Sequence, residues 1–293
     1  MKVLNYGSLN IDNVYSVDHF VRGGETLSST KMEIFSGGKG LNQSIALAKS
    51  GVEVWHAGAV GEGDGEFLLD MMREAGVNVS LVSHVAGKTG HAIIQRDGDG
   101  QNCILLFGGA NQQITREQVD AAMEHFEAGD FLVLQNEINE IAYIMEKAHE
   151  KGMKIVLNPS PMDEKIAGYP LEYVDYFLLN EIEAGDICGA QGEGEELLEK
   201  LGEKFPKAKI VLTLGGDGSM YRDGGLVLKQ PIYRVPVVDT TAAGDTFTGF
   251  FIGGLMLGEE PKEALDHAAK AAAIAVSRPG AAPSIPDRSE IER

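Results

Sequence analysis

Short apolar runs typical of strands alternate with longer helical patterns along most of the chain, and this alternation limits the fold more than any other feature. The strand-like runs KVLNYG and EVWHAGAVG, for example, lie on either side of LNQSIALAKSG, whose apolar residues have helical spacing. Strands that alternate with helices of this length indicate βαβ units, because parallel neighbours need a crossover connection. We therefore expect an α/β fold with three layers, in which helices cover both faces of a mostly parallel central sheet.

Two stretches interrupt this alternation. Residues from about 12 to 35 and from 89 to 107 alternate in β fashion around turns such as DGDG, and no helical pattern lies within them. We expect them to form an extra antiparallel sheet that projects from the main one as a lid over a site. No repeat and no Pro/Gly/Ser-rich linker divides the chain, so we expect residues 1–293 to form a single domain.

Composition and charge exclude several classes of partner. A formal net charge of −19 opposes binding to nucleic acid, which depends on clustered Lys and Arg. The longest apolar runs have strand length, so we expect no membrane span. The start MKVLNYGSLNID shows no secretory pattern, and Cys103 and Cys188 have no CxxC partner. We expect a cytoplasmic protein with reduced thiols.

The segment FSGGKGLNQ places several glycines directly before a helical pattern. Backbone without side chains lets a ligand approach a helix N-terminus closely, but a tight turn would need the same residues. The segment is neither GxGxxG nor GxxxxGK[ST], so it is neither a dinucleotide fingerprint nor a Walker loop. On its own it leaves both interpretations open.

The segment VDTTAAGDTFTGF is more informative. Ala242, Ala243 and Gly244 leave backbone amides unobstructed at the start of a helix, which favours an anion hole for developing negative charge. Asp245 follows immediately. An Asp in a first turn often serves only as a helix cap, but capping does not explain the small residues before it.

Together, GGKGLNQ and DTTAAGDTFTG resemble the two signature segments of the ribokinase family of carbohydrate kinases, the phosphofructokinase-B type. The resemblance covers essentially the whole chain, through GSLNID, VGEGDGEF, GGAN, LNPSP, LNEIEA, TLGGDG and AVSRPGAAPSIP. It implies a β lid over a sugar, MgATP as phosphoryl donor and a homodimer formed through the lids. The similarity is greatest to members that phosphorylate the 5-hydroxyl of D-ribose. Another sugar, a nucleoside, or a catalytically silent sugar-binding protein are the alternatives.

Sugar binding is expected first at GSLNID. Asn10 and Asp12 are two apart on a strand, so both side chains face the same way and offer donors and acceptors to hydroxyl groups. An exposed edge strand would be the simpler interpretation. The resemblance assigns further sugar contacts to Gly38, Lys39, Asn42, Glu137 and Asp245. Lys39 could instead be a solvated side chain near the loop.

The resemblance also implies the catalytic and nucleotide roles. Asp245 would accept the proton of the acceptor hydroxyl, since phosphoryl transfer depends mainly on positioning and charge neutralisation. Glu183 would hold Mg²⁺ through water within an N-x-x-E motif, because hard cations prefer oxygen ligands. The nucleotide-binding residues would be Asn180, Thr213, Gly215, Gly218 and Gly244.

A monovalent cation site is expected beside the anion hole. The segment AVSRPGAAPS resembles the cation loop of the family, and it would supply oxygens together with Asp239 and Thr241. The expected loop ligands are the carbonyls of Ala275, Arg278 and Gly280 and the hydroxyl of Ser284. One carboxylate among neutral oxygens suits K⁺ better than a divalent ion. The alternative is that Asp239 caps a turn and that Pro279 and Pro283 stiffen a loop.

Overall fold

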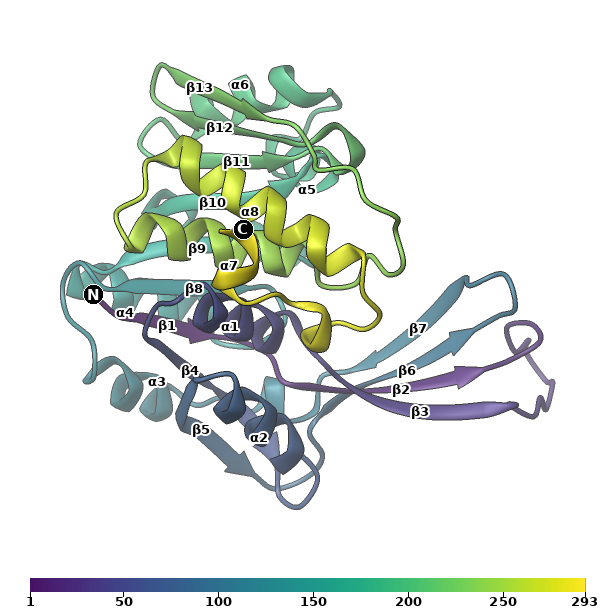
Figure 1. The fold of residues 1–293 in the computed structure, drawn as a ribbon. Helices are drawn as coiled ribbons and strands as arrows, with labels where there is room; N and C mark the ends of the chain where they lie inside the picture. The colour runs from purple at the N-terminus through teal and green to yellow at the C-terminus, as the bar shows by residue number, and fades with distance from the viewer. Residues whose placement is uncertain (293) are drawn as a thin grey trace.

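A computed structural model describes residues 1–292 (Figure 1). Its strands are β1 (Val3–Tyr6), β2 (Asn10–Ser16), β3 (Lys31–Gly37), β4 (Val54–Gly61), β5 (Asn78–Val85), β6 (Gly90–Arg96), β7 (Asn102–Phe107), β8 (Phe131–Gln135), β9 (Lys154–Asn158), β10 (Val174–Asn180), β11 (Lys209–Thr213), β12 (Ser219–Asp223) and β13 (Leu226–Gln230). Its α-helices are α1 (Lys39–Lys49), α2 (Glu66–Glu74), α3 (Arg116–Met123), α4 (Ile141–Lys151), α5 (Glu181–Cys188), α6 (Gly194–Lys204), α7 (Ala243–Met256), α8 (Pro261–Val276) and α9 (Arg288–Ile291). Short 3₁₀ turns include η2 (Glu164–Gly168) and η4 (Gly215–Asp217). Within residues 1–292, no helix combines the length and the apolar character that a membrane crossing requires.

The main sheet has the strand order β13-β12-β11-β10-β9-β8-β1-β4-β5. From β11 to β5 every neighbouring pair is parallel, whereas β12 pairs antiparallel with both β11 and β13. Helices connect the parallel strands, as crossover connections require. The expectation of a mostly parallel sheet is confirmed.

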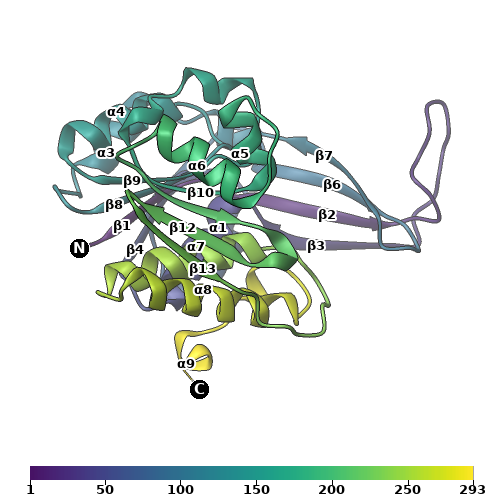
Figure 2. The ribbon, with the colours of Figure 1, turned by 90° about the horizontal axis from the view of Figure 1, so that it is seen from above.

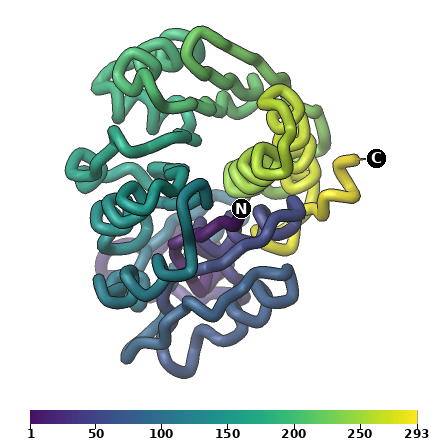
Figure 3. Tube along the Cα trace, turned by 90° about the vertical axis from the view of Figure 1, so that its left-hand side faces the viewer, coloured from purple at the N-terminus to yellow at the C-terminus, as the bar shows by residue number. Residues whose placement is uncertain are grey.

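Alternate residues of the strands enter two different cores. In β1, Val3 belongs to the core that contains residues of α1, α2, α7 and α8, whereas Leu4 belongs to the core that contains residues of α3 to α6. Figures 2 and 3 show the same division, with the yellow helices α7 and α8 on one face of the sheet and the teal helices α3 and α4 on the other. The three-layer α/β/α architecture is therefore confirmed.

A smaller sheet, the lid sheet, projects from the main body and has the strand order β3-β2-β6-β7 (Figure 1). Its strands lie in and around the two stretches, 12–35 and 89–107, where the sequence predicts a lid. The expectation of a fully antiparallel sheet is wrong, because β2 and β6 pair in parallel. Both strands leave the main body at the same end, after β1 and β5, and therefore run outward in the same direction.

Candidate active site

The carboxyl ends of four neighbouring parallel strands each carry a polar residue. Gln135, Asn158, Asn180 and Thr213 are the last residues of β8, β9, β10 and β11, respectively. Ligands of open α/β sheets bind in the crevice beyond such strand ends. A cavity of about 210 Å³ opens here, and the last three of these residues line it together with the first turn of α7.

Asp245 lies in that first turn and is only 7% exposed. Its Oδ2 accepts a hydrogen bond of 3.0 Å from Asn42 Nδ2, and its Oδ1 accepts one of 2.9 Å from Gln43 Nε2. Both donors belong to α1. The N-cap of α7 receives no side-chain hydrogen bond, so the interpretation of Asp245 as a helix cap is wrong. The carboxylate is instead held from the neighbouring helix.

The residues predicted to form the anion hole lie in the turn that starts α7. Ala242 has a φ of 61°, in the left-handed region, which is strained by roughly 1–3 kcal/mol for a residue with a Cβ. The amide of Ala243, one of the predicted donors, is directed to Thr240 O at 3.3 Å, whereas the amides of Gly244 and Asp245 find no acceptor within residues 1–292. A Cβ built on Gly244 would meet nothing within 4 Å. Free amides at a helix N-terminus, beside open space, suit an anionic group.

Asn10 and Asp12 lie where the lid sheet joins the main body. Asn10 is 8% exposed, and β2 lies between β3 and β6, so the interpretation as an exposed edge strand is wrong. Both neighbouring strands have a glycine beside these side chains. A Cβ on Gly37 would lie 2.2 Å from Asp12 Oδ2, and a Cβ on Gly90 would lie 2.4 Å from Asn10 Oδ1. These glycines therefore make room for the polar pair.

The charges of neighbouring carboxyl groups contribute to raising the pKa values of Asp12 and Glu137. Burial raises the pKa of Asp12 to about 6, and the charge of Glu137 adds to the effect. Burial also raises the pKa of Glu137, and hydrogen bonds from the Ser8 hydroxyl and the Lys39 amide oppose that rise. The charge of Asp245 acts on Glu137 in the same direction as burial. Clustered acceptors of this kind suit a ligand with several hydroxyl groups.

The glycine-rich loop contributes through its backbone and through Asn42. Glu137 Oε2 accepts from the Lys39 amide at 2.9 Å, so Lys39 takes part through its main chain, and Lys39 is among the residues that line the cavity. Gly38 has a φ of 96° and could not easily carry a Cβ, which would lie 2.9 Å from Ser8 O. The buried Oδ1 of Asn42 has no hydrogen-bond partner in residues 1–292. A bound hydroxyl would satisfy it.

The N-x-x-E motif has a structural role that the sequence reasoning missed. Asn180 Oδ1 accepts from the Glu183 amide at 2.9 Å, and Glu183 Oε2 accepts from the Asn180 amide at 3.0 Å. This reciprocal pair is a capping box at the start of α5. Glu183 Oε1 receives no donor within residues 1–292, and Glu183 lines the cavity.

The other predicted nucleotide residues are only partly brought together. Thr213 and Gly244 line the cavity with Asn180, whereas Gly215 and Gly218 are not among its lining residues. A Cβ on Gly218 would lie 2.2 Å from Gln230 O, so close backbone packing alone explains that glycine. The roles of Gly215 and Gly218 in nucleotide binding stay predictions.

The two segments of the predicted cation site are adjacent. The Gly280 amide donates to Asp239 Oδ2 at 3.1 Å, and the Thr241 amide donates to Asp239 Oδ1 at 2.9 Å. Burial opposes ionisation of Asp239, but the hydrogen bonds from Thr241 and Gly280 prevail and lower its pKa. The buried Ser284 hydroxyl donates to Ala281 O, which leaves its lone pairs available to a cation. No group of three or more His, Cys, Asp or Glu side chains in residues 1–292 has metal-binding geometry.

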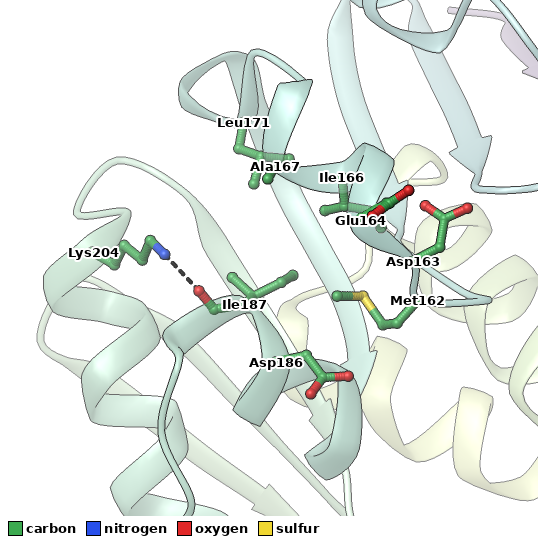
Figure 4. A pocket seen from close by; sticks show the side chains of 9 residues that line it. All are labelled: Met162, Asp163, Glu164, Ile166, Ala167, Leu171, Asp186, Ile187 and Lys204. Carbon is green, nitrogen blue, oxygen red and sulfur yellow. Dashed lines mark hydrogen bonds between the residues drawn. The ribbon is translucent and has the colours of Figure 1, made fainter.

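A second cavity, of about 380 Å³, lies between η2 and the helices α5 and α6 (Figure 4). It shares no lining residue with the first cavity. Its one lysine, Lys204, donates to the Ile187 carbonyl, as the dashed line in Figure 4 shows. Asp163 accepts from Asn136. We therefore assign the chemistry to the cavity at the strand ends.

Three polar residues near Asp245 were missed by the sequence reasoning: the buried Gln43 and Gln135, and the partly buried Asn158. Two of them end the strand patterns FLVLQ and KIVLN, where a polar residue closes an apolar run. A polar residue also closes the apolar runs of the next two strands, at Asn180 and Thr213. This pattern could have identified the whole binding edge of the sheet.

Comparisons with known proteins identify the family of the chain. The model of the pfkB family carbohydrate kinases matches residues 1–288. A ribokinase of Staphylococcus aureus is 33% identical over 301 residues, covering 100% of this chain and 99% of the relative. The structure of Arabidopsis thaliana ribokinase complexed with ribose and ATP has a TM-score of 0.90 at 29% identity, covering 99% of this chain and 97% of the other. Ribokinase from Cryptococcus neoformans in complex with ADP has a TM-score of 0.88 at 32% identity, covering 99% and 98%. The chain therefore belongs to the pfkB family of carbohydrate kinases.

Proposed function

We propose that this carbohydrate kinase transfers the γ-phosphoryl group of ATP to the 5-hydroxyl of D-ribose. The observation that carries the proposal is the position of Asp245, a buried carboxylate directly beside free helix N-terminal amides. The full-length similarity to ribokinases supports ribose as the acceptor. We infer that the reaction takes place in the cytoplasm, where ATP is supplied.

In the proposed reaction Asn10, Asp12, Asn42 and Glu137 bind the hydroxyl groups of the sugar. Asp245 then orients the 5-hydroxyl and accepts its proton as the oxygen attacks the γ-phosphorus. The amides of Gly244 and Asp245 stabilise the negative charge on the transferring group. The bond to the β-phosphate oxygen breaks, and ADP leaves.

Mg²⁺ fits the residues at the start of α5. Glu183 keeps one uncommitted carboxylate oxygen, Oε1, and this residue lines the same cavity as Ala242, Ala243 and Gly244. Carboxylate and amide oxygens at one cavity wall suit a hydrated magnesium ion, which would neutralise phosphate charge. We propose that Glu183 and Asn180 hold it through water.

K⁺ fits the loop beside Asp239. We propose that the carbonyls of Ala275, Arg278 and Gly280 and the side chains of Asp239, Thr241 and Ser284 provide its oxygen shell. The direct hydrogen bond from the Gly280 amide to Asp239 supports the proximity of the two segments. A bound cation would stabilise the turn that presents the anion-hole amides.

We propose that the chain acts as one kinase domain. We also propose that its lid sheet binds a second copy of this chain. Every residue of β7 is exposed, including Ile104 and Leu106, which lie on the same face of the lid sheet as Asp12. Large apolar side chains gathered on an exposed sheet indicate an interaction surface. A second copy presents the same apolar side chains, which makes the surface self-complementary in chemistry.

The test is a panel of pentoses, hexoses and nucleosides assayed for ADP release and ranked by kcat/KM. We expect ribose to rank first, with ribose 5-phosphate identified by ³¹P NMR. A nucleoside or hexose with a higher kcat/KM would replace ribose as the acceptor. Binding of ribose without ADP release would indicate the silent binding protein instead.

A further inference from the structure

Gln43, one of the two residues that hold Asp245, belongs to a line of buried side-chain amides. Its Nε2 donates to Asp245 Oδ1 at 2.9 Å and to Asn158 Oδ1 at 3.1 Å. Its Oε1 accepts from Gln135 Nε2 at 2.7 Å. Gln43 and Gln135 are both buried, and Gln135 contacts Asp245 only through Gln43 in the hydrogen-bond network.

The direction of each hydrogen bond in this line is determined. Asn5 Nδ2 donates to the Gly40 carbonyl at 2.8 Å, and a carbonyl can only accept. Asn5 Oδ1 must therefore accept, and it does so from Gln135 Nε2 at 3.0 Å. Because Gln135 presents its amide nitrogen, Gln43 must present Oε1 to it. Gln43 Nε2 is then directed to the Asp245 carboxylate, and an amide flip of Gln43 would break the line.

Stability alone does not explain Gln135. Its own Oε1 is buried without a hydrogen-bond partner in residues 1–292, which is costly in a core. A Cβ on Gly7 would lie 2.4 Å from this oxygen, so a glycine beside it is needed to accommodate the side chain. An apolar residue would fill the same space and remove this unpaired acceptor, but it would leave Gln43 Oε1 and Asn5 Oδ1 without a donor. The amide is useful where its donor is needed, at Gln43 and Asn5.

We propose that Gln43 is a positioning residue for Asp245 and that Gln135 fixes the orientation of Gln43. The proposal rests on the proposed function, because it takes Asp245 as the base for the acceptor hydroxyl. Asn42 holds one carboxylate oxygen and Gln43 the other, so together they set the rotation of the carboxylate. Loss of this orientation misplaces the base in the transition state and lowers kcat, while sugar binding is retained.

The test is a double-mutant cycle with Gln43→Met and Gln135→Met, which keep side-chain length and remove the donors. We expect Gln43→Met to lower kcat by about 10- to 100-fold, with KM for the sugar changed less than about threefold. Gln135→Met should lower kcat by about three- to tenfold in the wild type and have no further effect in the Gln43→Met background, because it acts through Gln43.

Ser50→Ala is the matched control, because it removes a buried hydrogen bond, Ser50 Oγ to Leu47 O, at the other end of α1. We expect its kcat to stay within about twofold of the wild type. If Gln43→Met does not fold, Gln135→Met alone decides: a lower kcat at unchanged KM supports the proposal, and the loss of its hydrogen bonds to Asn5 and Gln43 should lower the melting temperature as well. The proposal would be overturned if Gln135→Met lowered kcat by the same factor in the wild type and in Gln43→Met, or if the variants changed only KM.

Failure of the proposed acceptor is a separate outcome. If the wild type does not phosphorylate ribose, the ³¹P spectrum shows this before any variant is made. The cycle is then measured with the sugar or nucleoside that the wild type does phosphorylate. Since Asp245 would meet any acceptor hydroxyl at the same place, the expected factors are the same. A wild type without any kinase activity would overturn both proposals together.

Discussion

The two sheets of this molecule differ in what covers them. The main sheet has helices on both faces, and its strand ends, with the first turns of α5 and α7, place polar side chains and two buried carboxyl groups around one cavity. The lid sheet has no helix packed on it in Figure 1, and its strand β7 is exposed along its whole length. The residues proposed for chemistry belong to the covered part, whereas Asn10 and Asp12 lie where the two parts meet. Changes in the main sheet should therefore affect turnover, and changes in the lid should affect sugar recognition.

The strongest test of this division is Asp245→Asn, which keeps the shape of the side chain and removes the base. We expect kcat to fall by about 10² to 10⁴, because this is the usual contribution of a positioned general base. Ribose affinity, measured by calorimetry without ATP, should change little. Asp186→Asn, in the cavity of Figure 4, is the matched control. Near-normal turnover of Asp245→Asn would remove this residue from the mechanism.

Much of this arrangement could be predicted from the sequence. The alternation of strands and helices predicts the covered sheet, and DTTAAGDTFTG predicts the turn that presents free amides beside Asp245. Such features are local, since small residues and helical periodicity act within one segment.

Other features depend on segments far apart in the chain. The parallel pairing of β2 with β6 follows from the directions in which two distant strands leave the main sheet. The hydrogen bond between Gln43 and Asp245 joins two helices, and these residues are 202 positions apart in the sequence. The N-x-x-E motif shows a third limit, because one pattern predicts both a cation ligand and a capping box.

The second prediction tests sugar recognition at the root of the lid. We expect Asp12→Ala to raise KM for ribose by about 10- to 100-fold while KM for ATP changes less than about twofold, because the lost hydrogen bonds belong to the sugar. Asn13→Ala is the control, since Asn13 is the next residue of β2 and faces the opposite side of the lid sheet. Equal increases in both KM values would place Asp12 outside the sugar site.

The third prediction concerns the cation loop. In Tris buffer at constant ionic strength, added KCl should activate the enzyme about three- to tenfold with saturation, because an ordered loop preorganises the anion-hole amides. Asp239→Ala should reduce this activation. Loop order can be followed separately by the melting temperature with and without KCl. A flat response of the wild-type rate to KCl would contradict the cation site.

The fourth prediction concerns the lid surface. Ile104 lies on the same face of the lid sheet as Asp12, because Ile104 pairs with Ile94 and Ile94 with Val14, two residues from Asp12. Light scattering should give twice 31.4 kDa for the wild type and 31.4 kDa for Ile104→Glu, with KM for ribose raised about two- to fivefold. Ile34→Glu, on the opposite face, should remain a dimer. Unchanged mass for Ile104→Glu would contradict this interface.

The smallest expected effect separates Asp12 as a ligand from Asp12 as a buried acid. Its pKa of about 6 in the folded chain exceeds its ordinary value of 3.8, so the folded state holds the proton more tightly than the unfolded state. This group therefore favours folding at low pH, and that contribution is lost as the pH rises through about 6. Asp12→Asn cannot ionise, and we expect it to melt about 2 to 6 °C above the wild type at pH 8, with a smaller difference at pH 5.

Binding should show the opposite pH dependence, since the carboxylate accepts stronger hydrogen bonds from hydroxyl groups than the neutral acid does. KM for ribose should therefore rise about two- to fivefold between pH 7.5 and pH 5 in the wild type and stay nearly constant in Asp12→Asn. The measurement is KM at saturating ATP, with Asn13→Ala as the variant that keeps the wild-type profile. If Asp12→Asn retains the full pH dependence of KM, another acid of the cluster, with Glu137 the first to test, controls sugar binding.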